Sequence, residues 1–329
     1  MKSKIIVIGS NSFSGASFVD FCAESGFDVI AISRSEEYPN VFLPYKLNKR
    51  KNVTFVKADL NTDIDLIVKT IKDNKASLIV NFAAQGMVAE SWQNPIHWFR
   101  TNTLSHIKLH DQLRNFDFIE KYVHISTPEV YGNCEGIVDE TYPYNPSTPY
   151  ATSKAACDMS LKTFYKNYSF PVCWTRAANV YGACQALYRI IPKTILSVKL
   201  GKKLPLHGGG HSIRAFIHIR DVCDATLKIL CNSEPGEIYH LSTSRFISIR
   251  DLVRMITDSL GVVYEDAVEI VSDRPGKDSA YTLSSEKLRK TLLWEDKISL
   301  ENGINETVRW ISDNLDELKF LPDYYIHKE

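Results

Sequence analysis

Two neighbouring stretches decide how this chain folds: HISTPEVYG at residues 124–132 and YATSK at residues 150–154. The first stretch is rich in Val, Ile and Tyr, which predicts a buried strand that ends in polar residues. Because the chemistry of an open parallel sheet lies beyond the carboxyl ends of its strands, Thr127 and Glu129 are candidate catalytic residues.

Tyr150 and Lys154 lie four positions apart, so they share one face if residues 150–168 form a helix. A Lys ammonium beside a phenol stabilises the phenolate and lowers its pKa. We therefore predict that Tyr150 is a general base near neutral pH, with Lys154 as its partner. A Tyr and a Lys at this spacing also occur as an exposed helix pair without a function, so the prediction depends on the other motifs.

The composition of the 329 residues is that of a soluble globular protein, with 44% apolar and 24% charged residues. The 39 basic and 39 acidic residues give zero net charge, which argues against nucleic acid or an anionic membrane as a partner. Seven scattered Cys favour reduced cytosolic thiols, and the nine His show no ligand spacing, so no metal site is expected. With no signal peptide and no apolar run of about 18 residues, we expect a cytoplasmic protein.

Strands alternate with helices along the first half, which predicts an α/β fold with a doubly wound parallel sheet. Strands are expected at 4–8, 28–33, 53–56, 78–82, 119–125 and 172–175, and helices at 15–24, 63–74, 95–114 and 150–168. The turn after the first strand carries Gly9, Ser12, Phe13 and Gly15. Glycine lets backbone amides approach a pyrophosphate, so this turn is a candidate dinucleotide site or else an ordinary strand-to-helix turn.

The end of the second strand bears on the choice of cofactor. An acidic residue there binds the ribose of NAD, whereas an Arg accommodates the 2′-phosphate of NADP. Ser33 and Arg34 occupy this place, so we favour NADP over NAD. Glu36 and Glu37 follow closely and weaken that preference.

Together these motifs resemble the short-chain dehydrogenase/reductase superfamily, in its extended branch of nucleotide-sugar enzymes. The superfamily turn has three glycines, and Ser12 stands here at the middle position. The run Ser126-Thr127-x-Glu129-Val130-Tyr131-Gly132 is similar to 4,6-dehydratases of dTDP-glucose and GDP-mannose. The resemblance implies a Rossmann domain whose cofactor contacts also include Asp59, Leu60, Ala83, Ala84, Tyr150 and Lys154.

The resemblance further implies that residues 1–180 bind the dinucleotide, with 215–245 returning to that domain, and that 181–329 mainly bind a nucleotide sugar. The implied substrate contacts are Thr127, Glu129, Asn179, Arg189, His207, Arg214 and Arg274. Arg274 belongs to DRPGKDSAY at 273–281, which resembles a signature of glucose 4,6-dehydratases with Lys277 where His is usual. The resemblance implies that Asn102 stabilises the helix that carries Tyr150 and Lys154. It also implies a homodimer whose contact is formed by helices 95–114 and 150–168.

The implied chemistry begins when Tyr150, assisted by Thr127, takes the proton of the sugar C4 hydroxyl while a hydride passes to the cofactor. Glu129 then removes the C5 proton, water leaves from C6, and the hydride returns to C6. Pro128 stands where dTDP-glucose dehydratases have an acid for the C6 hydroxyl, so Glu129 also gives the proton or the elimination differs.

Three alternatives remain open from the sequence. They are a nucleotide-sugar 4-epimerase, a 4-dehydrogenase/5,6-dehydratase that leaves a 5,6-ene, and a binding protein on the same fold that has lost catalysis. Glu129 favours proton abstraction at C5, because an epimerase needs no carboxylate there. The presence of Tyr150, Lys154, Thr127 and Glu129 together argues against a lapsed enzyme.

Overall fold

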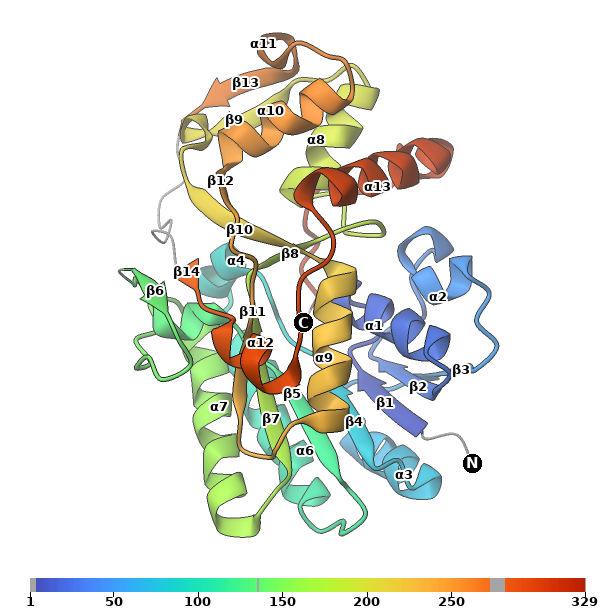
Figure 1. Cartoon of the computed structure of the whole chain (residues 1–329). Helices are drawn as coiled ribbons and strands as arrows, with labels where there is room; N and C mark the ends of the chain where they lie inside the picture. The colour runs from blue at the N-terminus through green and yellow to red at the C-terminus, as the bar shows by residue number, and fades with distance from the viewer. Residues whose placement is uncertain (1–3, 135, 273–281, 329) are drawn as a thin grey trace.

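The computed structural model describes residues 4–134, 136–272 and 282–328, and its largest element is a seven-stranded sheet (Figure 1). The strand order is β3-β2-β1-β4-β5-β7-β11, and every neighbouring pair is parallel. The strands are β1 (Lys4–Ile8), β2 (Asp28–Ser33), β3 (Val53–Lys57), β4 (Leu78–Asn81), β5 (Lys121–Ile125), β7 (Val172–Ala177) and β11 (Ile238–Leu241). The order reverses between β1 and β4, which creates the crevice where ligands bind in such sheets.

Helices cover both faces of this sheet (Figure 1). One face packs against α1 (Phe13–Glu24), α9 (Ile219–Asn232) and α12 (Glu286–Leu292), and the other against α3 (Ile64–Asn74), α6 (His106–Leu113) and α7 (Pro149–Tyr168). The first core contains Phe18 and Ile229, and the second contains Ile71 and Leu161, all fully buried. The predicted α/β fold with a doubly wound parallel sheet is therefore confirmed.

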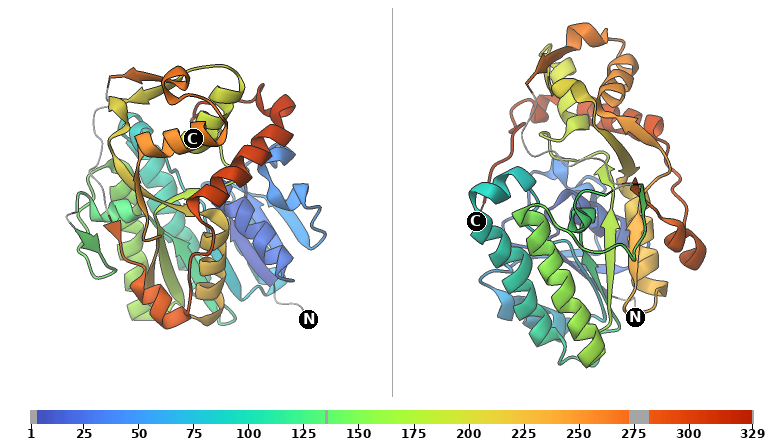
Figure 2. Two further views of the ribbon diagram at one scale, coloured as in Figure 1. Left: turned by 45° about the horizontal axis from the view of Figure 1, so that its top comes forward. Right: turned by 90° about the vertical axis from the view of Figure 1, so that its left-hand side faces the viewer.

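A smaller layer of strands and helices lies above the carboxyl ends of the sheet (Figure 1, Figure 2). Its strands are β8 (Asn179–Tyr181), β10 (Ile213–His218) and β12 (Phe246–Ser248), which form one sheet, and β9 (Leu204–His207) with β13 (Val268–Val271). Its helices are α8 (Ile190–Lys199), α10 (Ile249–Ser259), α11 (Tyr264–Ala267), α13 (Leu300–Asp313) and α14 (Leu315–Leu318). Residues 215–245 are predicted to return to the first domain. Within them, β11 joins the large sheet and α9 packs on its face, whereas β10 belongs to the upper layer. The domain boundaries themselves stay a prediction.

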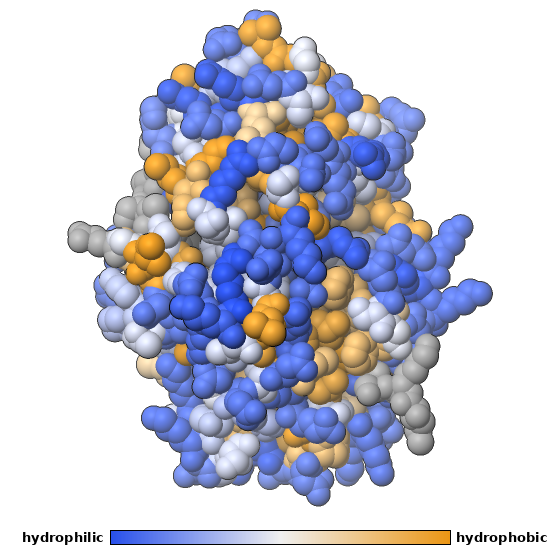
Figure 3. Space-filling view, viewed as in Figure 1, coloured by the Kyte–Doolittle hydropathy of each residue, from blue (hydrophilic) through white to orange (hydrophobic). Residues whose placement is uncertain are grey.

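The remaining elements are short: α2 (Pro44–Leu47), α4 (Val88–Gln93), α5 (Pro95–Phe99), a strand pair of β6 (Ile137–Val138) with β14 (Thr282–Leu283), and the turns η1 (Asn40–Phe42) and η4 (Gly208–Gly210). No helix among the described residues has the length and apolarity that crossing a membrane requires. Hydrophilic side chains predominate on the face shown in Figure 3.

One predicted helix differs from the structure, and the turn after the fifth strand has a defined shape. The expected helix 95–114 consists of α5, a π-helical segment η2 (Arg100–Ser105) and α6, and π-turns are frequent at functional sites. The strand expected at 119–125 ends at Ile125 as predicted, and Thr127 then caps a 3₁₀ turn, η3 (Pro128–Tyr131), by accepting a hydrogen bond from the Glu129 N–H. The polar residues after β5 therefore belong to a turn above the sheet.

Candidate active site

The turn after β1 has the shape that a pyrophosphate requires. Gly9 has φ of +85°, and a Cβ there would lie 2.5 Å from the backbone nitrogen of Ala83. A Cβ at Gly15 would lie 2.3 Å from the carbonyl oxygen of Gly9. Ser12 caps α1, because its Oγ accepts from the Gly15 N–H at 3.1 Å and donates to the Gly9 carbonyl at 2.7 Å. The serine at the middle position thus stabilises the turn, and the start of α1 faces open space above it, since Ser12 is exposed.

The other predicted cofactor residues lie at the same edge of the sheet. Ser33 ends β2 and is buried, and Arg34 follows it half-buried. The Asp59 carboxylate accepts from the Asn61 N–H at 2.8 Å and so shapes the turn after β3. Phe13 begins α1, Leu60 is buried beside Asp59, and Ala83 and Ala84 follow β4. These positions line both sides of the crevice, and their contact with a dinucleotide stays a prediction.

Lys154 is held by the end of β5. It is buried on α7, its Nζ donates to the carbonyl of Ile125 at 2.7 Å, and it lies 3.3 Å from the Nε2 of His124. Burial lowers the pKa of Lys154. The side chain therefore fixes α7 against the strand that precedes the turn with Thr127 and Glu129.

The pKa of Tyr150 is raised, contrary to the lowering expected from Lys154. Burial is the main cause, and the negative charge of Glu129 adds to it. A hydrogen bond with Thr127 and the positive charge of Arg189 act in the opposite direction. Thr127 is therefore hydrogen-bonded to the phenol of Tyr150, and the charges of Glu129 and Arg189 act on it.

The remaining predicted substrate residues lie in the upper layer. Asn179 on β8 donates to the carbonyl of Ala215 at 3.2 Å, which joins β8 to β10. His207 at the end of β9 is hydrogen-bonded to the carbonyl of Ser272 at 3.0 Å, and Arg214 on β10 donates to the carbonyl of Ile213. Arg274 and its signature lie outside the described residues.

Asn102 is hydrogen-bonded to α7, the helix that carries Tyr150 and Lys154, as predicted from the resemblance. Its side-chain amide donates to the carbonyl of Gln85 and to the Oγ of Ser153, both at 3.0 Å, and its Oδ1 accepts from the Gln85 N–H at 2.8 Å. The π-helical segment η2 thereby connects the turn after β4 to α7.

Sequence reasoning missed the polar residues that support the site from below. Asp158, fully buried on α7, accepts from the Oγ of Ser126 at 2.6 Å and from the Nη2 of Arg176 at 2.9 Å. A signal was available, because Tyr150, Lys154 and Asp158 recur every four residues and so share one face of a helix. A charged residue on that buried face needs a partner of opposite charge.

A glycine turn at the switch point of a parallel sheet, with a Tyr–Lys helix beside the end of β5, defines an extended short-chain dehydrogenase/reductase. The family model for GDP-mannose 4,6 dehydratase matches residues 6–307. The chain therefore belongs to this family of nucleotide-sugar 4,6-dehydratases, and the predicted family is confirmed.

Individual relatives agree with this assignment. A dTDP-glucose 4,6-dehydratase of Streptomyces niveus is 32% identical over 319 residues, which cover 94% of this chain and 93% of that protein. The crystal structure of the dTDP-glucose 4,6-dehydratase of Bacillus anthracis in complex with NAD is 31% identical, with a TM-score of 0.86 over 96% of this chain and 98% of that one. The UDP-glucose 4-epimerase of Thermotoga maritima with UDP-glucose is 25% identical, with a TM-score of 0.86 over 95% and 99%.

Buried histidines beneath the site predict a loss of stability in mild acid. Burial lowers the pKa of His106 and His240 to about 3, and lowers those of His110 and His124 as well. The unfolded chain binds these protons below about pH 6.5 while the folded chain does not, so stability is highest above that pH and falls below it. Each group costs up to about 1.4 kcal/mol per pH unit. We expect the urea midpoint to fall between pH 6.5 and 4.5.

A pair of variants isolates the histidine contribution. His240→Asn should reduce the pH dependence of the urea midpoint, whereas the exposed His211→Asn should leave it unchanged. If the urea midpoint changes equally with pH in the two variants and the native chain, the role of buried His240 is contradicted.

Proposed function

We propose that this protein is a nicotinamide-dependent nucleotide-sugar 4,6-dehydratase, which converts an NDP-hexose to an NDP-4-keto-6-deoxyhexose. The observation that carries the proposal is that Thr127 and Glu129 lie on the turn after β5, which packs against α7 with Tyr150 and Lys154. In one site, a phenol can accept the proton of the C4 hydroxyl, and a carboxylate can then accept the proton of C5. The dehydratase relatives support the same reaction.

The residues divide the proton transfers between them. Tyr150 accepts the C4 hydroxyl proton, and its hydrogen bond with Thr127 orients the phenol. The positive charges of Lys154 and of the oxidised cofactor favour the phenolate that this step needs. A nicotinamide dinucleotide, which Gly9, Ser12 and Gly15 would hold by its pyrophosphate, would supply reversible hydride transfer with the sugar. Once C4 is a ketone, the C5 proton is acidic, and we assign its removal to Glu129 on η3.

The loss of water requires an acid for the C6 hydroxyl. Pro128, between Thr127 and Glu129, has no proton to give and is buried. We propose that Glu129, protonated at C5, delivers that proton to the leaving hydroxyl. One carboxyl group then serves both halves of the elimination. When the hydride returns to C6, C5 takes up a proton that originates from solvent, and Tyr150 releases the proton that it took from the C4 hydroxyl, so no net proton is consumed.

The reaction can be tested by product mass. Incubation of a dTDP-, UDP-, GDP- or CDP-hexose should give a product lighter by about 18 mass units, the mass of the water lost in the proposed elimination. In D2O the product should gain one deuterium at C5. Tyr150→Phe should lower the rate by at least about 10²-fold. Glu129→Gln should abolish water loss and C5 labelling, because the amide cannot accept the C5 proton.

Epimerisation is the second candidate, and Pro128 is the observation that favours it. If the elimination lacked an acid, the 4-keto sugar would be turned and reduced again, as in the epimerase neighbour. A product of unchanged mass, with Glu129→Gln still active, would replace the dehydratase proposal by this one.

We propose that the cofactor is NADP or NAD and that Arg34 determines which of the two is bound more tightly. A guanidinium after β2 suits a 2′-phosphate, which supports NADP, whereas the relative from Bacillus anthracis was crystallised with NAD. If NADP is the partner, Arg34→Ala should weaken NADPH binding at least about tenfold more than NADH binding, since a charged hydrogen bond to the 2′-phosphate is lost. Fluorescence titration of both dinucleotides measures this, and equal losses for both would favour NAD.

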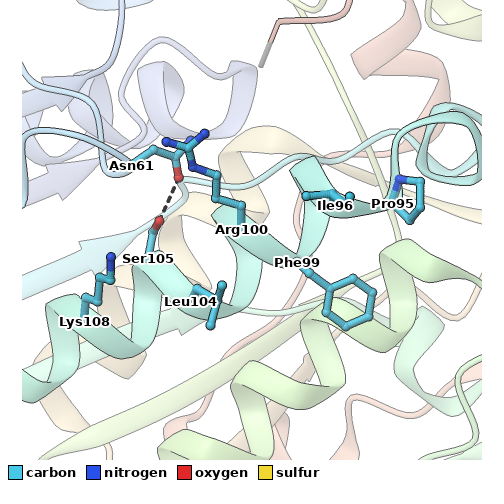
Figure 4. Close-up of a pocket in the computed structure, with 8 residues that line it drawn as sticks. All are labelled: Asn61, Pro95, Ile96, Phe99, Arg100, Leu104, Ser105 and Lys108. Atoms are coloured by element: carbon cyan, nitrogen blue, oxygen red, sulfur yellow. Dashed lines mark hydrogen bonds between the residues drawn. The ribbon is translucent and has the colours of Figure 1, made fainter.

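We also propose a homodimer formed through α4–α7, in a cytoplasmic protein. Trp92, Ile96, Leu104 and Met159 on these elements are 52–77% exposed. Ile96 and Leu104, with Phe99, line an open pocket of about 480 Å³ (Figure 4). Apolar side chains gathered on one face are typical of a subunit contact.

Light scattering tests the homodimer. Ile96→Asp places a charge in the proposed contact, so the mass in solution should fall from two chains to one. Ile270 on β13 in the upper layer is similarly exposed, at 65% against 77%, and Ile270→Asp is the matched control that should leave the mass unchanged. A monomeric native chain would contradict the proposal.

A further inference from the structure

The last residues of the chain cross the carboxyl edge of the large sheet. Residues 322–328, here named the strap, follow α14 and descend beside the helices drawn in teal in the right-hand view of Figure 2. Burial alternates along the strap, because Asp323, Tyr325 and His327 are partly buried while Tyr324, Ile326 and Lys328 are exposed. Such alternation is typical of an extended segment with one face against the protein.

One end of the strap contacts the residues that follow β2. The backbone carbonyl of Lys328 accepts from both Nη atoms of Arg34 at 3.4 Å. The Lys328 ammonium lies 5.1 Å from the centre of the Tyr38 ring, within the range of a cation–π interaction. The strap therefore lies over the place where the adenosine ribose of a dinucleotide is expected.

The same residues also contact the opposite side of the crevice. The Lys328 carbonyl accepts from the Nε2 of Gln85, after β4, at 2.6 Å. The His327 ring stacks on Trp98 and on His97 of α5, each with ring centroids 5.2 Å apart. The Nε2 of His327 lies 2.9 Å from the Nδ1 of His97.

A third contact reaches the upper layer. The Tyr325 ring meets the edge of Tyr188 at 5.7 Å, and Tyr188 precedes Arg189, whose charge acts on Tyr150. The strap thus touches the β2 side, the β4 side and the loop that leads to α8.

The order of the strands shows what lies beneath the strap. β1 is between β4 and β2, so a segment that contacts the residues after both of these strands passes over the turn that follows β1. No hydrogen bond, ion pair or ring contact in the described part of the chain joins the strap to residues 9–13. Ser12 is exposed, and Gly9 and Phe13 are only partly buried. The strap therefore bridges the crevice and leaves the pyrophosphate turn open.

We infer that the strap is the outer wall of the cofactor site and retains the adenosine-diphosphate half of the dinucleotide. This inference rests on the proposed function, since it takes the crevice as the dinucleotide site. The reaction returns its hydride within each turnover, so the cofactor has no need to leave, and a segment that slows its release suits that chemistry. Tyr325 and His327 are the residues that anchor the strap, and Lys328 joins the two sides through its carbonyl.

Dissociation of the cofactor tests the inference directly. A chain that ends at Leu321, and the variants Tyr325→Ala and His327→Ala, should release NADH or NADPH at least about tenfold faster than the native chain. Tyr324→Ala and Ile326→Ala change neighbouring side chains that face solvent, and they should release it at the native rate. Stopped-flow fluorescence with an excess of ADP-ribose as competitor measures these rates. A thermal midpoint for each variant shows that it is folded.

The possible outcomes distinguish a failure of the strap inference from a failure of the proposed function. If the native chain binds neither dinucleotide, the proposed function and the strap both fail. If it binds one of them and the shortened chain releases it at the native rate or more slowly, only the strap inference fails.

Hydrogen exchange gives a second measurement on the unmodified chain. Addition of the dinucleotide should slow amide exchange in residues 322–328, because the strap closes on the ligand. Faster exchange would mean that the ligand displaces the segment, and unchanged exchange would mean that the two do not touch. Either result would overturn the inference.

Discussion

The ion pair of Asp158 and Arg176 is the interaction on which the site depends. Both side chains are fully buried, and charges removed from water are strongly destabilising unless each finds a partner. Arg176 on β7 also donates to the hydroxyls of Tyr131 and Tyr144, and Tyr131 is hydrogen-bonded to His240 on β11 at 2.6 Å. One buried pair therefore ties α7 to two strands and to the turn after β5. The register of α7, and with it the position of its tyrosine and lysine, follows from this connection.

The elements of the large sheet could be predicted because their signals are local. Apolar runs of four to seven residues, each followed by a polar turn, predict parallel strands, and the glycines after β1 indicate a close approach of backbones. Gly9 indeed packs so tightly on Ala83 that a methyl group would not fit. Residues 95–114 have the pattern of a single helix, and the sequence does not indicate the π-helical segment because the contacts of Asn102 with distant residues set it. Periodicity alone does not contain those contacts.

The residue types in the site are predictable from the sequence, but the electrostatic effects between them are less so. The sequence predicts a tyrosine, a lysine, a threonine and a glutamate near one strand end, and the structure brings them to that end. The expected lowering of the Tyr150 pKa is wrong for the protein alone, because burial of the phenol outweighs the effects that lower its pKa. The contacts of the last residues carry no motif, and Arg34 meets Lys328 across 294 positions of sequence. Only the folded chain can reveal such a pairing.

The place of β11 at the edge of the sheet has a consequence for how the protein is made. β11 pairs with β7, yet it is encoded more than 60 positions later, after the chain has built part of the upper layer. During synthesis on the ribosome, the outer edge of β7 stays unpaired until residue 241 has emerged. An open edge of this kind is a template for pairing with other chains. The nascent protein is thus most vulnerable to aggregation in that interval, and cutting the gene near residue 180 would make the exposure permanent.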